Sequence, residues 1–380
     1  MNKTKYISKL SKVSQVVDMS NKIRSSLLAV EKKYAFLSNE YYLSLIDWDD
    51  PDDPIRRIAI PSEAELRPWG KLDASSEHDY VAAPGLEHKY TDTALLLVNN
   101  VCGTFCRFCF RKRLFMSENE EVSRDVSAGL EYISRHPEIN NVLLTGGDPL
   151  LLSTKRLGEI LRKLDTLEHI EVIRIGSKML AFNPRRVLGD PALVALLGEH
   201  SRPDRRLYLM AHFNHPRELT GEAREAIRLI REAGVVIMNQ TPMIRGVNDS
   251  AKVLRELFSA LASIGVAPYY VFQCRPTQGN FAYTVPIEEG YKHFAKAMAG
   301  CSGLARRARF VMSHATGKVE VSGLSDDYIF MRYHRAAKPK DEGKFLMAER
   351  NPHAYWLDDY TVETPEQFIE VEKAAAAICS

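Results

Sequence analysis

Three cysteines lie close together in Cys102-Gly-Thr-Phe-Cys106-Arg-Phe-Cys109, directly after an apolar run at 95–98. Thiolates at this C-x₃-C-x₂-C spacing can converge on one soft metal centre, and cysteines hold four-iron clusters. A cubic cluster has four irons and the segment supplies three ligands, so one iron would stay open for a small molecule. A zinc site lacking its fourth ligand and three unrelated core cysteines are the alternatives.

A second candidate site is Thr145-Gly146-Gly147-Asp148-Pro149, which follows another apolar run. Glycine lets a ligand approach the backbone closely, with free N–H groups as donors. We expect Gly146 and Gly147 to hold the amino end of a ligand on the open iron, and Asp148 to orient their loop. A purely structural turn is the alternative for so short a motif.

Two further polar positions could line the same pocket. Arg111 lies two residues past Cys109, and an arginine fork matches a carboxylate bidentately. This position favours a substrate or cofactor contact over a solvated side chain. In His212-Phe-Asn214-His215, two histidines three residues apart do not complete a metal coordination set. We therefore interpret this cluster as pocket lining rather than as a metal site.

Lys318 follows Gly317 and is flanked by the apolar runs 310–312 and 319–321. This pattern could bury its amine. A buried lysine loses its charge readily and can form a Schiff base with a carbonyl cofactor. A surface lysine in a turn is the alternative.

A strand-then-helix alternation would bring these residues together. Short apolar runs typical of a parallel sheet recur six times, with helical patterns between them. Such alternation indicates crossover helices, and six units fall short of a closed TIM barrel, so we predict an α/β partial barrel. The predicted strands are 94–99, 141–145, 172–176, 207–211, 235–239 and 269–273, and the predicted helices are 123–134, 155–164, 193–199, 223–233, 252–264 and one after Pro286.

Each of the six predicted strands is followed by polar or glycine-rich residues. Functional residues of such folds gather at the C-terminal ends of the strands. The first of these loops carries the cysteines and the last is Cys274-Arg275-Pro276. The pattern therefore predicts six loops that converge on one pocket.

Residues 8 to about 45 have apolar side chains at spacings of three and four. This predicts a helix packed on the main domain, with a partner-binding helix as the alternative. A breaker-rich connection follows at 49–54. We predict an N-terminal helical extension and connector over 1–89, the barrel over 90–300 and a C-terminal segment with Lys318 over 301–380.

The composition is that of a soluble globular protein, with 45% hydrophobic and 26% charged residues among 380. The net charge of +2 gives no reason to expect nucleic acid or an acidic membrane surface as a partner. The segment Met1-Asn-Lys-Thr-Lys lacks the apolar core expected of a signal peptide, and no apolar run approaches the eighteen residues of a membrane span. Six cysteines, three of them scattered, do not make a disulfide framework, so we expect a cytoplasmic location.

Taken together, these residues resemble the lysine 2,3-aminomutase family of radical S-adenosylmethionine (SAM) enzymes, from about Asp53 to about Arg335. The cysteine spacing alone indicates only the radical SAM superfamily, and later blocks narrow the resemblance to the aminomutases. The matching segments are 53–57, 84–90, 102–113, Thr145-Gly-Gly-Asp-Pro-Leu150, Arg174-Ile-Gly-Ser177, His212-Phe-Asn-His-Pro216, Asn239-Gln240, Arg245-Gly-Val-Asn-Asp249 and Gly317-Lys318.

The resemblance implies a partial (β/α)6 TIM-type radical SAM barrel and an isomerase that moves an amino group from carbon 2 to carbon 3. It implies a [4Fe-4S] cluster on the cysteines, SAM on the fourth iron, and pyridoxal 5′-phosphate (PLP) held by Lys318 as an imine. It also implies a small-molecule amino-acid substrate and an electron donor such as flavodoxin or ferredoxin, and it leaves a homo-oligomer open. Arg111 falls at the position that binds the substrate carboxylate, and the other implied cofactor-binding residues are Lys89, Tyr90, Gly146, Gly147, Asp148, Ser177, His212, Asn214 and Gln240.

Three departures from the family concern the substrate and zinc. Lysine-specific relatives bind the distal ammonium with two aspartates, whose positions fall here at Arg275 and near Ser313 and His314. Arginine would repel a lysine ammonium and could grip a carboxylate. We therefore expect glutamate to β-glutamate, with lysine (free or for translation-factor modification) and a non-catalytic iron–sulfur protein as alternatives. A zinc-binding cysteine of lysine enzymes is replaced here by Ser250 and the tail offers only Cys379, so we predict no zinc.

Overall fold

A single sheet of twelve strands organises the computed structural model, which describes residues 4–116, 121–122 and 125–364. Strands β5 to β11 run parallel to their neighbours in chain order. Antiparallel strands extend both ends of this parallel part. The strands are β3 (Val81–Ala83), β4 (Leu86–Tyr90), β5 (Thr93–Asn99), β6 (Asn141–Gly146), β7 (Val172–Ser177), β8 (Leu207–Ala211), β9 (Val236–Pro242), β10 (Ala267–Phe272), β11 (Arg309–His314), β12 (Gly317–Leu324), β13 (Tyr328–Ala336) and β14 (Phe345–Glu349).

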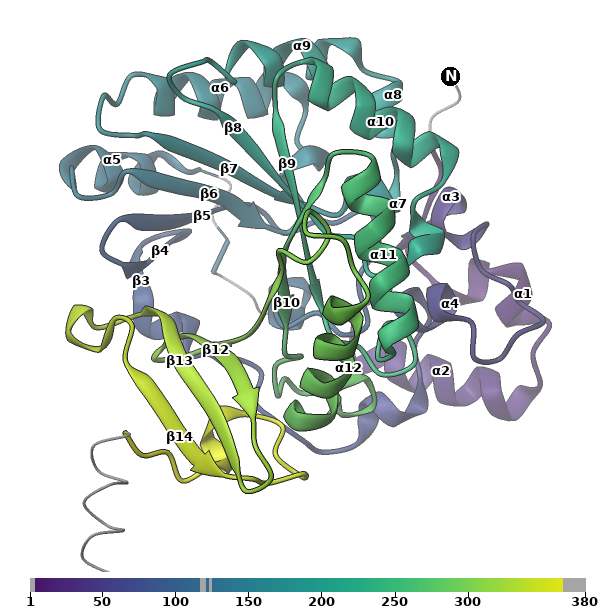
Figure 1. Cartoon of the computed structure of the whole chain (residues 1–380). Helices are drawn as coiled ribbons and strands as arrows, with labels where there is room; N and C mark the ends of the chain where they lie inside the picture. The colour runs from purple at the N-terminus through teal and green to yellow at the C-terminus, as the bar shows by residue number, and fades with distance from the viewer. Residues whose placement is uncertain (1–3, 117–120, 123–124, 365–380) are drawn as a thin grey trace, which may run out of the picture.

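The six predicted strands are β5 to β10, and helices connect them along the outside of the sheet (Figure 1). The alternation continues one step further than predicted, because the last helix leads into β11, which pairs in parallel with β10. The first two residues of the helix predicted at 123–134 lie outside the described residues. The crossover helices are α5 (Ser127–Arg135), α6 (Thr154–Asp165), α9 (Pro191–Glu199), α10 (Gly221–Glu232), α11 (Ala251–Ser263) and α12 (Ile287–Ala299), with short helices α7 (Met179–Phe182) and α8 (Arg185–Leu188) before α9.

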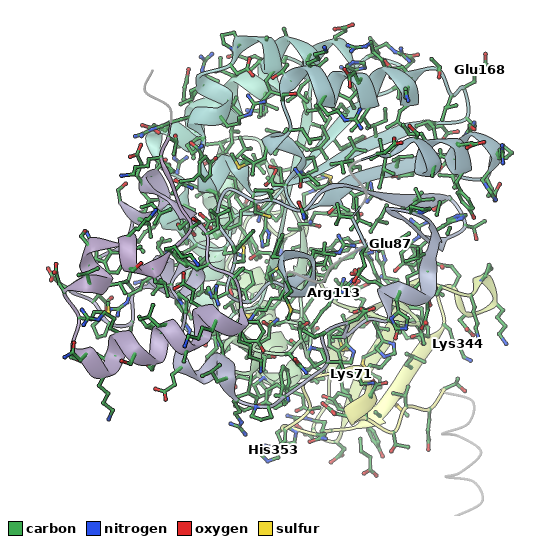
Figure 2. The ribbon with its side chains drawn as sticks, turned by 180° about the vertical axis from the view of Figure 1, so that it is seen from behind. Lys71, Glu87, Arg113, Glu168, Lys344 and His353 are labelled. Carbon is green, nitrogen blue, oxygen red and sulfur yellow. The ribbon has the colours of Figure 1, made fainter. Side chains whose placement is uncertain are left out.

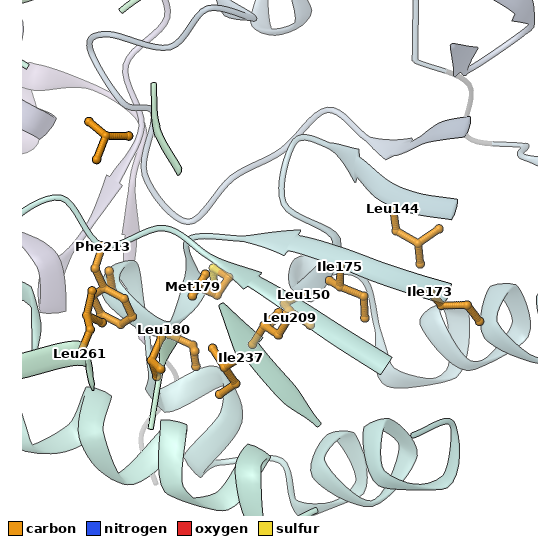
Figure 3. Packing of buried hydrophobic residues seen from close by; sticks show 14 of the residues in the cluster. Leu144, Leu150, Ile173, Ile175, Met179, Leu180, Leu209, Phe213, Ile237 and Leu261 are labelled. Atoms are coloured by element: carbon orange, nitrogen blue, oxygen red, sulfur yellow. The ribbon is translucent and has the colours of Figure 1, made fainter. Parts of the chain in front are cut away.

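The main core lies between the sheet and its outer helices (Figure 3). Burial alternates along β6 and β7: Val142, Leu144, Ile173 and Ile175 are buried, and the residues between them in each strand are only partly buried. Successive side chains of a strand point to opposite faces, so the inner face of the sheet is not filled by its own apolar side chains. Arg174 of β7 belongs to this inner face. The inner face of β6 and β7 thus carries partly buried polar side chains, Thr145 and Arg174 among them.

The N-terminal segment is helical only in part. It contains α1 (Ser14–Val17), α2 (Asn21–Lys33), α3 (Glu40–Leu43) and α4 (Pro54–Ala59), and β1 (Tyr6–Ile7) pairs with β2 (Ser38–Asn39). Ser20 caps the start of α2 and thereby breaks the continuous helix expected over 8–45. The apolar residues of the N-terminal segment form a second core together with Phe108 and Phe182. The segment thus packs on the main domain, as predicted.

The two ends of the curved sheet approach each other through side chains. The Lys318 amine of β12 lies 4.9 Å from the ring centre of Tyr90 on β4, and the Arg335 guanidinium of β13 lies 4.7 Å from the same ring. The sheet is continuous across the expected boundaries at 89/90 and 300/301. In the part of the chain that the structure describes, no helix is long and apolar enough to cross a membrane.

A segment that we call the strap, residues 67–80, lies across the ends of β10 and β11. The Lys71 N–H donates to the Pro276 carbonyl at 2.9 Å, and the Ser75 hydroxyl donates to the Ser313 carbonyl at 2.8 Å. The Tyr80 hydroxyl donates to the Ala315 carbonyl at 2.7 Å. The strap thus brings its own side chains over the loop that carries Arg275, a predicted substrate-binding residue.

Candidate active site

The cysteine loop follows β5 and is held by the N-terminal segment. The Asn39 side-chain amide donates to the Gly103 carbonyl at 2.8 Å, and the Phe105 N–H donates to the Leu37 carbonyl at 2.9 Å. Between the second and third cysteines, the Arg107 N–H donates to the Ile58 carbonyl at 2.9 Å. Residues from outside the barrel therefore fix the loop's backbone.

The three thiols lie close enough to influence one another. Burial raises the pKa of Cys102, Cys106 and Cys109, and for Cys102 the other two cysteines raise it further. The positive charge of Lys178 acts in the opposite direction on the pKa of Cys106. A cation bound at the loop would favour the thiolate forms.

The glycine loop after β6 packs directly on the start of the cysteine loop. The Gly147 N–H donates to the Asn99 carbonyl at 2.6 Å, so the expectation of a free donor was wrong for this residue. A Cβ at Gly147 would meet the Val101 carbonyl oxygen at 2.3 Å. Asp148 orients the loop, as expected, by accepting from the Ser177 hydroxyl at 2.8 Å and the Lys178 N–H at 2.8 Å.

The pocket lining expected at His212 and Asn214 contains a buried ion pair. The Lys178 amine donates to Asn214 Oδ1 at 2.7 Å and to Glu218 Oε1 at 2.6 Å. Asn214 Nδ2 lies 3.1 Å from His212 Nε2, and burial together with Lys178 holds the pKa of His212 well below its usual range. Gln240, on β9 between these loops and β10, is partly buried.

Lys318 lies among cationic groups on the inner face of the sheet. Burial, Arg174, Lys89 and Arg275 lower the pKa of Lys318 to about 7. Burial likewise lowers the pKa of Lys89 to about 8, and the Lys89 amine donates to the His314 carbonyl. A basic cluster of this kind suits an anion such as a phosphate beside a neutral amine.

Arg111 and Arg275 are joined by Glu77 of the strap. Arg111 Nε lies 3.0 Å from Glu77 Oε2, and Arg275 Nη1 lies 3.2 Å from Glu77 Oε1. Arg113 Nη2 adds a third contact to Glu77 at 2.7 Å. These guanidiniums hold the pKa of Glu77 far below its usual value against the effect of burial. Glu87 of β4 also contacts Arg111, at 3.1 Å from Nη2. Glu87 and Arg113 are labelled in Figure 2.

Arg275 keeps donors available toward the pocket. Its guanidinium lies 3.7 Å from the ring centre of Phe110, and Nη1 contacts Glu77. Among the described residues, its Nε and Nη2 groups have no hydrogen-bond partner. Its side chain is 15% exposed.

Ser313 and His314 are less available than expected. His314 Nδ1 lies 2.8 Å from the Thr316 hydroxyl, and Nε2 lies 3.2 Å from Asp358 Oδ1. Both ring nitrogens therefore have partners within the chain. The Ser313 carbonyl accepts from the strap, and no contact brings either side chain to Arg275 within the described part of the chain.

Comparison with known proteins identifies the family. The family model "Radical SAM superfamily" matches residues 96–257. A protein of Aquifex aeolicus (strain VF5), named provisionally as an L-lysine 2,3-aminomutase, is 57% identical over 94% of this chain and 96% of its own length. The chain belongs to the lysine 2,3-aminomutase family.

More distant relatives carry two different substrate names. The L-lysine 2,3-aminomutase of Fusobacterium nucleatum is 35% identical over 77% of this chain and 68% of its own length. The glutamate 2,3-aminomutase of Clostridioides difficile (strain 630) is 31% identical over 79% of this chain and 70% of its own length. This chain is thus a radical SAM aminomutase, an isomerase, whose family contains enzymes named for lysine and for glutamate.

Membership of the radical SAM superfamily implies a four-iron cluster and SAM, and the cysteine loop of this aminomutase fits them. Its three thiols are the soft donors that such clusters use, on one anchored loop. Within residues 4–116, 121–122 and 125–364, no three His, Cys, Asp or Glu side chains already surround a metal position. The fit therefore rests on the donor chemistry and anchoring of the loop. The expected absence of zinc stays a prediction, since Cys379 lies outside the described residues.

Sequence reasoning missed the acids that contact the predicted arginines of this aminomutase. Glu77 lies in the polar stretch before the barrel, where no local pattern marks it. Glu87 could have been found, because alternation along β4 places it on the same face as Lys89. Arg113, in the basic tail of the cysteine loop, was not assigned its contact with Glu77.

Proposed function

We propose that this aminomutase is PLP-dependent and moves the α-amino group of glutamate to the β-carbon. The observation that carries the substrate assignment is Arg275, whose Nε and Nη2 groups have no hydrogen-bond partner among the described residues. Charge influence between Arg275 and Lys318 supports their proximity. Arg275 suits a side-chain carboxylate, which a fork can bind bidentately, and would repel a side-chain ammonium.

The residues around Lys318 fit PLP. A pKa near 7 leaves the Lys318 amine largely neutral in mildly alkaline solution, as carbonyl chemistry requires. Lys89 and Arg174 supply positive charge for a phosphate, and Tyr90 presents its ring to the Lys318 amine. PLP, when bound, supplies a conjugated ring that delocalises an unpaired electron, and SAM on the cluster supplies the radical. The protein positions these groups and excludes water.

Arg111 is the proposed site for the substrate α-carboxylate. It is 4% exposed and sits between the cysteine loop and the strap, so it can orient an amino acid between the cluster and Lys318. Glu77 positions both Arg111 and Arg275. Such fixed geometry holds the reacting atoms close and limits side reactions.

Lysine is the second candidate substrate, and a specific observation favours it. Glu77 and Glu87 are buried carboxylates in the same pocket, and either could accept a distal ammonium. The Aquifex aeolicus relative is also named for lysine. Against this, Glu77 already contacts three guanidiniums, which leaves it little capacity for another cation.

The test is turnover by the reconstituted, reduced enzyme with glutamate and with lysine, followed by chromatography of the β-amino acids. We expect β-glutamate, and we expect Arg275→Gln to lose most of it. Production of β-lysine without β-glutamate would refute the substrate assignment. A cluster without PLP absorbance would instead favour a non-catalytic iron–sulfur protein. A cytoplasmic location and a flavodoxin or ferredoxin as electron donor belong to this proposal.

A further inference from the structure

Every nitrogen of Arg111 already has a partner, and only the second N–H of Nη1 is left without one in the described part of the chain. Its Nε donates to Glu77 at 3.0 Å, and its Nη1 donates to the Thr145 hydroxyl at 3.2 Å. Its Nη2 is shared between Glu77 at 3.1 Å and both oxygens of Glu87 at 3.1 and 3.2 Å. A bidentate contact with an amino acid therefore requires one of these partners to leave.

Of the two acids on Arg111, Glu87 is held the more weakly. Glu77 contacts Arg111, Arg113 and Arg275, so displacing Glu77 would leave three guanidiniums without their shared carboxylate. Both Glu87 oxygens contact a single nitrogen, Arg111 Nη2, and no other hydrogen bond to its side chain is found in the described part of the chain. Departure of Thr145 would free Nη1 alone, whereas a fork needs two nitrogens. Displacing Glu87 breaks fewer contacts than displacing Glu77 and frees an N–H of Nη2 beside the second N–H of Nη1.

A displaced Glu87 could not keep its charge without cost. It is 5% exposed on β4, and a buried carboxylate without a partner is strongly disfavoured. An incoming carboxylate on Arg111 would also add a negative charge beside Glu77. Protonation of one oxygen by solvent removes both penalties and leaves a neutral carboxyl group that can stay buried.

We propose that Glu87 is a resident carboxylate that occupies Arg111 in the substrate-free enzyme, yields Arg111 to the substrate α-carboxylate, and takes up one proton as it does so. This inference rests on the proposed function, because it requires an amino acid whose carboxylate binds at Arg111. Glu87 would not touch the substrate; it acts through Arg111 and is a positioning residue.

The surrounding charges make Glu87 easy to protonate. Burial and Glu77 raise its pKa to about 7, although Arg111, Arg113 and Arg275 act to lower it, and Lys89 faces it from the same strand. Replacing the Arg111 contact with a second carboxylate raises that pKa further. Above the pKa of Glu87 in the substrate-free enzyme, substrate binding takes up a proton. The affinity for glutamate is therefore highest below pH 7 and weakens as pH rises through 7.

The experiment is anaerobic calorimetry of glutamate binding to the holoenzyme, without reductant, in buffers of different ionisation enthalpy. Comparison of buffers gives the number of protons exchanged. We expect the wild type to take up roughly half a proton more than Glu87→Gln at pH 7, and close to one more at pH 8. The subtraction removes protons exchanged by the cofactor chemistry, which both proteins share.

A matched control is Glu222→Gln, which removes a carboxylate that contacts Arg185 on the outside of the sheet, and its proton exchange should equal that of the wild type. The wild type alone supplies a second measurement, since its Kd for glutamate should rise by up to about tenfold per pH unit above pH 7. Equal proton exchange in wild type and Glu87→Gln would overturn the inference while leaving the proposed function standing. Proton release attributable to Glu87, as pairing with an ammonium would cause, would also overturn it. Failure of the holoenzyme to bind glutamate would overturn the proposed function and the inference with it.

Discussion

Glu65 offers a sharp test of how the cysteine loop is held. This fully buried acid from outside the barrel accepts from Arg107 Nε at 3.0 Å and Arg107 Nη2 at 2.7 Å. It also accepts from the Tyr283 hydroxyl at 2.9 Å, and the Lys112 amine lies 3.4 Å away. Since Arg107 lies between Cys106 and Cys109, one acid holds the side chain of the residue between two of the proposed cluster ligands.

The structure predicts an order of damage for two substitutions. Glu65→Gln leaves Arg107 and Lys112 as buried cations without their carboxylate, and removing one partner of a buried ion pair costs about 3–5 kcal/mol. Arg107→Met leaves Glu65 with Lys112, Tyr283 and the Ser62 N–H, which donates to it at 3.0 Å. We therefore expect a smaller loss for Arg107→Met, about 2 kcal/mol.

The assay is urea unfolding of the cluster-free protein, followed by iron and sulfide content after reconstitution. Glu65→Gln should have the lower free energy of unfolding and incorporate less iron. Glu222→Gln, which breaks a partly exposed pair with Arg185, should change the free energy by less than about 1 kcal/mol. The reasoning is refuted if Arg107→Met is the more destabilising substitution, or if Glu65→Gln keeps wild-type stability and iron content.

Three further predictions concern the pocket. The rate at which the apoprotein captures PLP, followed by visible absorbance, should rise with pH around a midpoint near 7 as Lys318 loses its proton; a midpoint near that of free lysine would contradict the burial argument, and Lys318→Ala should capture none. Arg275→Lys, which keeps the charge without the fork, should lower kcat/KM for glutamate roughly 10–100-fold, and an unchanged value would exclude a bidentate contact. Gly147→Ala should lose SAM binding in equilibrium dialysis, because its Cβ would meet the Val101 carbonyl at 2.3 Å. The control Gly221→Ala, with open space around its Cβ, should bind SAM as the wild type does. Equal binding by both variants would show that the loop tolerates displacement.

The strands and helices of the barrel followed from local patterns. Apolar runs and helix starts depend on residues a few positions apart, such as Ser153 before α6 and Ser250 before α11, whose side chains cap the helices. Where the sequence-based prediction was incomplete, the missing element depends on contacts between residues far apart in the chain. The seventh parallel strand, β11, was missed because its position depends on pairing with β10.

The residues of the candidate site likewise include some that local sequence predicts and others that it does not. The spacing of Cys102, Cys106 and Cys109 marks a ligand set by itself, because the three residues share one short loop. The partners of Arg111 and Arg275 could not be predicted from short-range spacing, since the contact between Arg275 and Glu77 joins residues 198 positions apart. Nothing local distinguishes an arginine that awaits a substrate from one already paired with an acid.

The sequence by itself determined the strand-and-helix alternation, the cysteine loop and the family resemblance, because each depends on residue types at short, fixed spacings. Only the tertiary structure decided which charges meet. Curvature of the sheet brings β4 to β12, and the strap places Glu77 between Arg111 and Arg275. Burial then sets the protonation of Lys318 and Glu87, because the free energy of a charge depends on the groups and solvent that surround it.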